Sequence, residues 1–196
     1  LTASHVAALT SAQITALGTA QVSSLQTAQV AALDVAALSG LETADLRVLN
    51  SSQIQALTTD QIPILTTAQW SALTTDQIAA LTTSQIAAMP SQHLQSMGTA
   101  QVGALDTSQV AALPVSALQG LSTTSVAAMT GMQLAAMSTS QMIALDGDLI
   151  AAIETTDLPI LTSAQVAAWS TDQVAAVTSE QWGVITSGQW AALSSE

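Results

Sequence analysis

Four acidic side chains in the second half of the chain have the types and spacing of a calcium-binding loop. They are Asp146, Asp148, Glu154 and Asp157. Calcium binds about six to eight oxygen ligands, many of them from carboxylates, and Gly147 suits the tight loop that such a site needs. All four acids also fall at positions where acids recur along the whole chain. We therefore treat them as a candidate calcium site and favour ordinary structural carboxylates as the interpretation.

Two histidines and a row of glutamines are the next candidates for chemistry. His5 and His93 both occupy a position at which 16 other copies of an eight-residue repeat carry glutamine. Eleven repeats separate the two histidines, which disfavours a shared metal ion. The glutamines could form a polar ladder for ligands, but capping of helices explains them without a ligand. Both histidines are therefore predicted to replace a capping glutamine.

Aromatic side chains could form a platform for a sugar or a protein partner. The four tryptophans are Trp70, Trp169, Trp182 and Trp190, and all of them fall at apolar positions of the repeat. Packing in the core is therefore the favoured interpretation. Three of the four lie near the C-terminus, so this region is the first place to look for a localised binding patch.

No set of residues in the sequence points to an enzyme. The chain lacks cysteine, a Gly-rich phosphate loop, an HExxH motif and the G-x-S-x-G elbow of a serine nucleophile. A sequence that is nearly the same in every copy also offers no local asymmetry for a unique active site. The sequence therefore predicts neither catalysis nor a cofactor.

Composition argues against several classes of partner. Thirteen acidic residues against a single arginine, Arg47, give a net charge of −12. The phosphates of nucleic acids and anionic membrane surfaces would repel such a chain. Mean hydropathy is positive, yet no window of about 18 residues is free of Gln, Ser, Thr or Asp, as a spanning helix would require. We therefore expect neither nucleic-acid binding nor membrane insertion.

An unbroken eight-residue repeat must position all of these residues. Counted from Thr2 as position 1, 24 copies run to Leu193 without a gained or lost residue, and positions 5 and 8 are apolar in every copy. The clearest copy, TTDQIAAL, spans residues 74–81. Eight residues overshoot two turns of a continuous α-helix by about 80°, and residues three apart lie on opposite faces of a strand. Long helices, coiled coils and strands are therefore excluded, and one short helix per repeat remains.

The polar positions predict where each helix starts. Position 1 is Ser, Thr, Asp or Asn in 17 copies, and these residues are preferred at the N-cap. Position 4 is Gln in 16 copies, which is the spacing of a capping box. All 13 acids lie at positions 1, 3 or 4, where the helix dipole favours negative charge. A helix of about six or seven residues is expected to follow, stable only when repeats stack on one another.

The predicted fold is all-α: an elongated α-solenoid of 24 very short helices that forms a single domain over residues 1–196. Pro63 and Pro159, both at position 6, are expected to shorten their helices to one turn or to a 3₁₀ helix. Gly40 and Gly120 mark two atypical copies where the solenoid could bend. Alanine at position 7 in 16 copies indicates close approach of neighbouring helices. Layers of two repeats and layers of three repeats both fit the sequence.

The segment LTTDQIAALTTSQIAAM, residues 73–89, resembles octapeptide arrays of the form L-T-x-x-Q-[IV]-x-x-L in very large bacterial repeat proteins, often secreted or surface-associated. The resemblance covers essentially the whole chain and implies a place within a longer polypeptide, outside the cell or on its surface. The first and last copies match the consensus instead of forming polar caps. We therefore expect either further repeats beyond both ends or stacking of apolar ends between molecules.

Two functions remain as hypotheses from the sequence. The first is a non-enzymatic spacer or scaffold within a large bacterial protein. The second is a protein-interaction or self-assembly module that uses the solenoid face or its open ends. A spacer predicts no saturable ligand, whereas a binding module predicts a localised patch.

Overall fold

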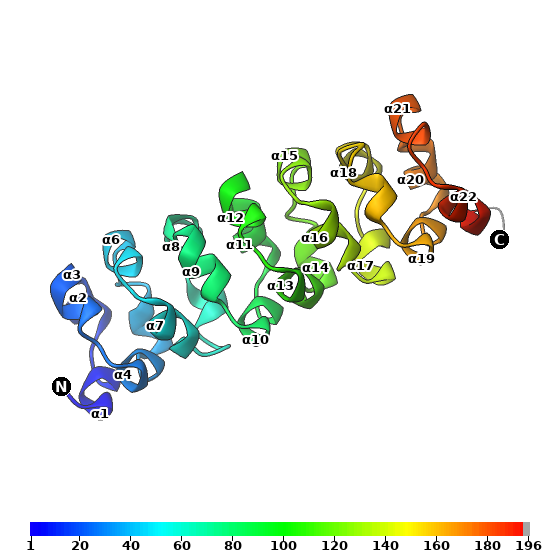
Figure 1. Cartoon of the computed structure of the whole chain (residues 1–196). Helices are drawn as coiled ribbons and strands as arrows, with labels where there is room; N and C mark the ends of the chain where they lie inside the picture. The colour runs from blue at the N-terminus through cyan, green and yellow to red at the C-terminus, as the bar shows by residue number, and fades with distance from the viewer. Residues whose placement is uncertain (194–196) are drawn as a thin grey trace. The chain divides into compact units, whose positions relative to one another are not determined.

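The computed structural model describes residues 1–193, and each repeat within them contributes one short helix. Twenty-two of these helices are α-helical, two are 3₁₀ helices, and no strand occurs among the described residues. The chain forms two compact units, Leu1–Met97 and Gly98–Glu196. Figure 1 shows the short helices and the turns that join them. The predicted all-α repeat solenoid is confirmed within each unit, while a single domain over both units stays a prediction.

Both units are built from the same short element. The helices of the first unit are α1 (Ala3–Ala7), α2 (Ser11–Thr15), α3 (Thr19–Ser23), α4 (Thr27–Ala31), α5 (Val35–Leu38), α6 (Thr43–Arg47), α7 (Ser51–Ala56), η1 (Ile62–Ile64), α8 (Thr67–Ala72), α9 (Thr75–Ala80), α10 (Thr83–Ala87) and α11 (Ser91–Ser96). Those of the second unit are α12 (Thr99–Gly103), α13 (Thr107–Ala112), α14 (Val115–Leu118), α15 (Thr123–Ala127), α16 (Gly131–Ala135), α17 (Thr139–Ile143), α18 (Gly147–Ala151), η2 (Leu158–Ile160), α19 (Ser163–Ala167), α20 (Thr171–Ala176), α21 (Ser179–Trp182) and α22 (Ser187–Leu193). Most of them are slightly shorter than the six or seven residues predicted.

The helices begin where the capping residues predict. In α9 the N-cap residue Thr74 has an extended backbone, and its hydroxyl oxygen accepts a hydrogen bond from the backbone N–H of Gln77 at 3.2 Å. The side-chain Oε1 of Gln77 accepts in return from the backbone N–H of Thr74 at 2.9 Å. This reciprocal pair satisfies two of the N–H groups that a helix start leaves without partners. The capping box is therefore confirmed.

Proline changes the helix type in two repeats. Pro63 and Pro159 lie within η1 and η2, the two 3₁₀ helices among the described residues. Proline has no backbone N–H and its ring obstructs the preceding turn, so only the tighter single turn forms. The shortened helices predicted at both prolines are confirmed.

Stacking of repeats sets the period of each solenoid. In the first unit α1 packs against α4 and α2 against α5, and in the second α12 packs against α15 and α13 against α16. These partners are three repeats apart. Side-chain hydrogen bonds reach four repeats back, as from Gln85 to Leu57. The packing of the helices therefore favours the layer of three repeats considered from the sequence over the layer of two.

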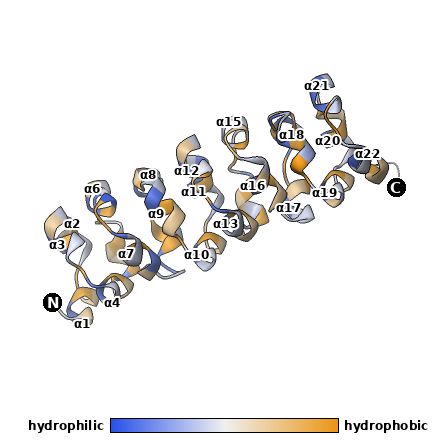
Figure 2. Ribbon diagram, in the orientation of Figure 1, coloured by the Kyte–Doolittle hydropathy of each residue, from blue (hydrophilic) through white to orange (hydrophobic). Residues whose placement is uncertain are grey.

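The core of each unit consists of the apolar side chains at positions 5 and 8. Ile78 and Leu81, from one repeat, are 0% and 4% exposed. Figure 2 shows hydrophobic and hydrophilic stretches alternating along the ribbon within each repeat. Because no helix is long enough to be stable alone, burial of these two rows between layers must hold the helices in place.

One glycine allows two layers to approach closely. A Cβ atom on Gly40 would lie 2.4 Å from the backbone oxygen of Ser11, three repeats earlier. The hydroxyl of Thr15 donates a hydrogen bond to the backbone oxygen of Gly40 at 2.9 Å. No described glycine has a positive φ. Gly40 is thus required for close packing, a role that the interpretation as a bend did not anticipate.

Candidate functional site

The polar residue of the core is the glutamine at position 4. In α10, the side-chain Nε2 of Gln85 donates hydrogen bonds to the backbone oxygens of Ile54 and Leu57, at 2.8 and 2.7 Å. These two carbonyls belong to the C-terminal part of α7 and the turn after it, four repeats earlier. The side chain of Gln85 is 2% exposed. A single buried amide thus connects the start of one helix to the end of another.

The same contact recurs in both units, and we call the set of side chains that make it the glutamine ladder. Each member donates from Nε2 to the backbone oxygen of the position-8 residue four repeats earlier, at 2.6–2.9 Å. In the first unit the members with this geometry are Gln53, Gln61, Gln69, Gln77 and Gln85. In the second unit they are Gln133, Gln141, Gln165, Gln173, Gln181 and Gln189.

Both ends of the glutamine amide are used. In the same repeat, Oε1 of Gln85 accepts from the backbone N–H of Thr82 at 2.8 Å, which closes the capping box. A glutamate could accept that bond as well, but an ionised carboxylate has no proton to donate to the carbonyls of the earlier layer. Loss of the donor would be costly, because the carbonyls are buried and no water molecule can replace it.

The ladder was missed from the sequence, although one signal of it was present. Position 4 is Gln in 16 copies and Glu in none, while the capping box and the helix dipole both accept Glu. A requirement for a donor explains this preference for Gln over Glu. Capping, the role inferred from the sequence, accounts for the Oε1 atom of the amide but not for its Nε2 group.

The two histidines replace glutamine in different ways. Nδ1 of His5 accepts from the backbone N–H of Thr2 at 3.1 Å, so the predicted capping role is confirmed there. His93 instead makes the ladder contact, with Nε2 2.7 Å from the backbone oxygen of Leu65. Its helix has Pro90 at the N-cap, which offers no N–H, and Nδ1 of the fully buried His93 has no partner. His93 therefore makes the donor contact to the earlier layer that a ladder glutamine makes, but it does not cap its own helix.

Burial sets the protonation of His93. Desolvation lowers its pKa, against a smaller opposite effect of the hydrogen bond to the Leu65 carbonyl. The ring stacks on Trp70 with centroids 4.8 Å apart and planes 10° from parallel. A neutral imidazole with the proton on Nε2 fits these surroundings, because the charged form would carry a second donor with nothing to accept it.

A comparison with known protein families decides what kind of repeat this is. The model of one family, described as the ALTTAQ repeat, matches residues 1–35, 35–75, 65–91, 78–114 and 150–195, more than half of the chain. The chain belongs to the ALTTAQ repeat family. No curated protein matches it.

Six of the ALTTAQ repeats have neither glutamine nor histidine at position 4. Their position-4 residues are Ala37, Asp45, Ala117, Ser125, Leu149 and Asp157. In several of these six repeats, another residue contacts a repeat three copies away. Nε of Arg47 donates to the backbone oxygen of Ala72 at 3.0 Å, and Oδ1 of Asp157 accepts from the backbone N–H of Gly131 at 2.8 Å. Asp45 is 3% exposed, and its Oδ2 has no hydrogen-bond partner.

The four carboxylates of the calcium candidate lie in two successive repeats, and only Asp146 caps its helix. Asp146 is the N-cap of α18 and accepts from the backbone N–H of Leu149 at 2.9 Å, while Asp148 lies in the first turn of the same helix. Glu154 and Asp157 begin the following repeat, where the backbone oxygen of Glu154 accepts from the N–H of Asp157. Among residues 1–193, no three His, Cys, Asp or Glu side chains are grouped to hold a metal ion. Calcium binding here stays a prediction.

The tryptophans divide between the core and a surface. Trp70 and Trp169 are buried, at 0% and 6% exposure. Trp182 is half-buried and stacks on Trp190, which is 51% exposed, with centroids 5.0 Å apart and planes 29° from parallel. The first two are packing residues, as predicted, while the second pair forms an exposed aromatic surface in the last two ALTTAQ repeats.

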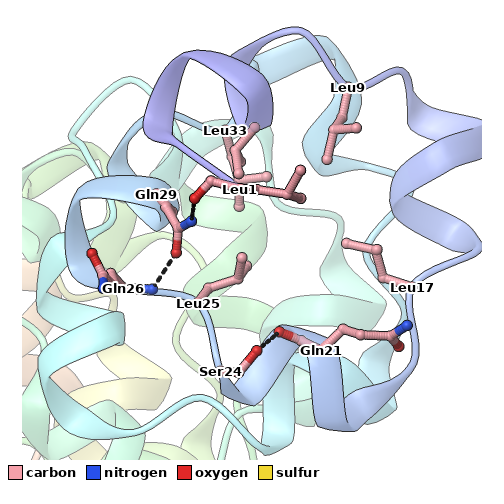
Figure 3. Close-up of a pocket in the computed structure, with 10 residues that line it drawn as sticks. Leu1, Leu9, Leu17, Gln21, Ser24, Leu25, Gln26, Gln29 and Leu33 are labelled. Carbon is pink, nitrogen blue, oxygen red and sulfur yellow. Dashed lines mark hydrogen bonds between the residues drawn. The ribbon is translucent and has the colours of Figure 1, made fainter.

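The first unit contains a cavity among its first repeats. Figure 3 shows Leu9, Leu17 and Leu25 around this cavity, close to Gln21 and Gln29. Gln29 donates to the backbone oxygen of Leu1, and its Oε1 accepts from the backbone N–H of Gln26 at 2.6 Å. The three leucines occupy position 8 but are only half-buried, unlike Leu33 in the next repeat. The cavity is thus the part of the core that no layer covers.

Membrane insertion can be assessed from the helices themselves. Within the described part of the chain, none of the helices has the length and hydrophobicity needed to cross a bilayer.

Proposed function

We propose that this ALTTAQ chain is a non-enzymatic scaffold, acting as a spacer within a large bacterial protein outside the cell or on its surface. The observation that supports this most is the glutamine ladder. Its buried amides, which could otherwise bind a ligand, are occupied by contacts between repeats. Almost every polar core group that the repeat conserves from copy to copy therefore serves assembly of the array.

A scaffold of this kind should tolerate a change in the number of repeats. Each ladder bond connects equivalent positions, so removal of a whole repeat presents every glutamine with the same two carbonyls from another copy. Removal of half a repeat would instead place apolar and polar positions out of register. Length can then change in steps of eight residues without damage to the fold.

Deletions in the second unit test this proposal. One variant lacks residues 138–145 and the other lacks residues 138–141, each with spin labels on cysteines introduced at the exposed residues Thr107 and Ser179. The chain has no cysteine of its own to interfere. We expect the eight-residue deletion to keep cooperative unfolding and to shift the label distance to a single new value. The four-residue deletion should broaden the distances and abolish the cooperative transition.

A second candidate function is a protein-interaction module, and the exposed stack of Trp182 on Trp190 favours it. Aromatic side chains of this kind are common in binding patches. A saturable ligand whose binding is lost on truncation after residue 177, but survives deletion of any earlier repeat, would replace the spacer as the leading function.

A further inference from the structure

Asp45 is a buried carboxylate for which the protein provides no partner. The residue lies in α6, at position 4 of its repeat, and its Oδ2 atom makes no hydrogen bond although the side chain is only 3% exposed. Unlike the ladder glutamines, Asp45 closes no capping box at the start of its helix. Native proteins rarely leave such a group without a partner, and a bound ion is one of the few explanations.

The register of the ladder places Asp45 opposite a backbone oxygen that also lacks a partner. In the next repeat, Nε2 of Gln53 donates to the backbone oxygen of Leu25, 28 residues earlier, at 2.7 Å. The residue 28 positions before Asp45 is Leu17, and no described N–H group donates to its backbone oxygen. An ionised carboxylate has no proton to donate. Two acceptors therefore face each other between these layers of the first unit.

The shorter side chain of aspartate leaves space between the two oxygens. Asp45 has one methylene fewer than a ladder glutamine, which shortens its reach by roughly 1–1.5 Å. Since ladder amides lie 2.6–2.9 Å from the position-8 oxygen, the carboxylate should stop roughly 4 Å from the oxygen of Leu17. Oxygen ligands lie about 2.3–2.6 Å from a calcium ion, and sodium is nearly the same size. One such ion fits between the two oxygens.

No basic side chain of the protein neutralises Asp45. Arg47, on the same helix, is the only Lys or Arg in the chain, and its Nε donates to the backbone oxygen of Ala72 at 3.0 Å. Ala72 belongs to α8, which packs on α6 from the following layer, whereas Asp45 faces the preceding layer. A buried charge without a counter-charge is costly in free energy. The positive charge must therefore come from solution, where the net charge of −12 attracts cations.

Asp157 shows how an aspartate at position 4 is accommodated without an ion. Its Oδ1 accepts a hydrogen bond from the backbone N–H of Gly131 at 2.8 Å, and its side chain is half-buried. An N–H donor and solvent thus serve this carboxylate. Asp45 has the same chemistry but neither of these partners.

We propose that Asp45 and the backbone oxygen of Leu17 bind a sodium ion between two layers of the first unit. The backbone oxygen of Ile14, placed by the same register, is a third ligand. One positive charge balances one carboxylate, whereas a divalent ion would leave a net charge buried. Backbone carbonyls at the ends of helical segments are ligands that suit sodium. The ion replaces the missing ladder amide; this goes beyond the scaffold proposed above, which requires no ion.

Urea denaturation of the whole chain tests for the ion. Sodium chloride replaces choline chloride at constant ionic strength, so screening of the net charge stays the same while choline is too large for the site. Once the site is more than half filled, the unfolding equilibrium constant should fall by up to tenfold for each tenfold rise in sodium concentration. Potassium, which requires longer contacts to oxygen, should act only at higher concentration.

Two variants tie this response to the site. Asp45→Asn removes the charge with little change of shape and should abolish the difference between sodium and choline. Asp45→Gln, which supplies the ladder amide in place of the ion, should abolish it as well. Asp157→Asn makes the same charge change at position 4 in the second unit and should respond to sodium like the unaltered chain. Circular dichroism checks that all three variants remain helical.

Sodium-23 nuclear magnetic resonance measures binding without unfolding. The sodium line should be broader with the unaltered chain and with Asp157→Asn than with Asp45→Asn. An equal sodium response in Asp45→Asn, or no preference for sodium over choline in the unaltered chain, would overturn the proposal; a protonated Asp45 that donates to Leu17 would produce the second result. A stronger response through Asp45 to potassium or to calcium would overturn the assignment of sodium.

Discussion

The repeat of Gln85 and the repeat of Gly40 are attached to their neighbours by different contacts. Gln85 uses one buried amide that reaches four repeats back, and the same contact recurs along both units. The repeat of Gly40 has Ala37 at position 4 and cannot make it; Gly40 instead packs against the backbone of Ser11, three repeats back, and accepts from Thr15. The solenoid therefore tolerates loss of the ladder at a repeat where a specific close contact replaces it.

The largest effect should come from Gln85→Glu. The carboxylate would keep the capping bond but face the carbonyls of Ile54 and Leu57 without a donor, at a position that is 2% exposed. We expect the free energy of unfolding to fall by roughly 3 kcal/mol or more at pH 7. Because burial raises the pKa of such a carboxyl, stability should recover as pH falls and the protonated acid becomes a donor.

Urea denaturation at pH 7 and pH 4 measures this effect. Gln13→Glu is the matched control, since that side chain is exposed and donates to nothing. Its unfolding free energy should change by less than about 0.5 kcal/mol. Equal losses in the two variants would show that the ladder bond contributes nothing beyond the capping box.

The second effect concerns Gly40→Ala. The new methyl group would meet the backbone oxygen of Ser11 at 2.4 Å, and a backbone atom cannot move aside as a side chain can. We expect a loss of about 1–3 kcal/mol in the free energy of unfolding. In Gly103→Ala the nearest atom is 3.6 Å away, so removal of a flexible helical glycine should stabilise by about 0.5–1 kcal/mol. Chemical denaturation should show opposite signs, and matching signs would exclude the close-contact role.

The third effect should be a gain in stability from restoring the ladder contact at Asp45. Its buried Oδ2 has no partner, and Asp45→Gln would place an amide donor toward the carbonyls of Ile14 and Leu17, by the spacing seen elsewhere in the ladder. Thermal or urea unfolding should show a gain of about 1–2 kcal/mol. Asp76→Gln, at an exposed first-turn position, should change little. No gain at Asp45 would mean that the local packing of this repeat has no room for the amide.

The smallest effect should be a dependence of stability on pH through His93. Its folded-state pKa lies below the unfolded value near 6.5, so the unfolded chain binds the proton more readily. Stability should therefore be complete above that pH and should decrease as pH falls below it. His93→Gln should remove this component, whereas His5→Gln, at an exposed site, should leave it unchanged. Unfolding free energies measured from pH 5 to pH 8 give the comparison.

Local features of this fold could be predicted from the sequence, and long-range ones could not. The N-caps, the capping glutamines and the 3₁₀ turns at Pro63 and Pro159 depend on residues within one repeat, so one copy is enough to predict them. The number of repeats per turn depends on which copy faces which. Since the copies are nearly identical, no residue pattern distinguishes a neighbour three repeats away from one two repeats away.

The same argument applies to the candidate sites. The capping half of Gln85 was predictable because its partner, Thr82, is three residues away. Its second partner, Leu57, is 28 residues away and contributes only a backbone oxygen, which every residue has. The close approach at Gly40 could not be predicted for the same reason, because Ser11 contacts Gly40 through its backbone oxygen.

The direction of the ladder has a consequence for biosynthesis. Every ladder glutamine donates to carbonyls 28 and 31 residues nearer the N-terminus, as Gln85 does to Leu57 and Ile54. Those acceptors are translated before the glutamine and leave the ribosome ahead of it. Each newly made repeat can thus dock onto a finished surface, so the array can fold vectorially as it emerges, without waiting for the C-terminal repeats.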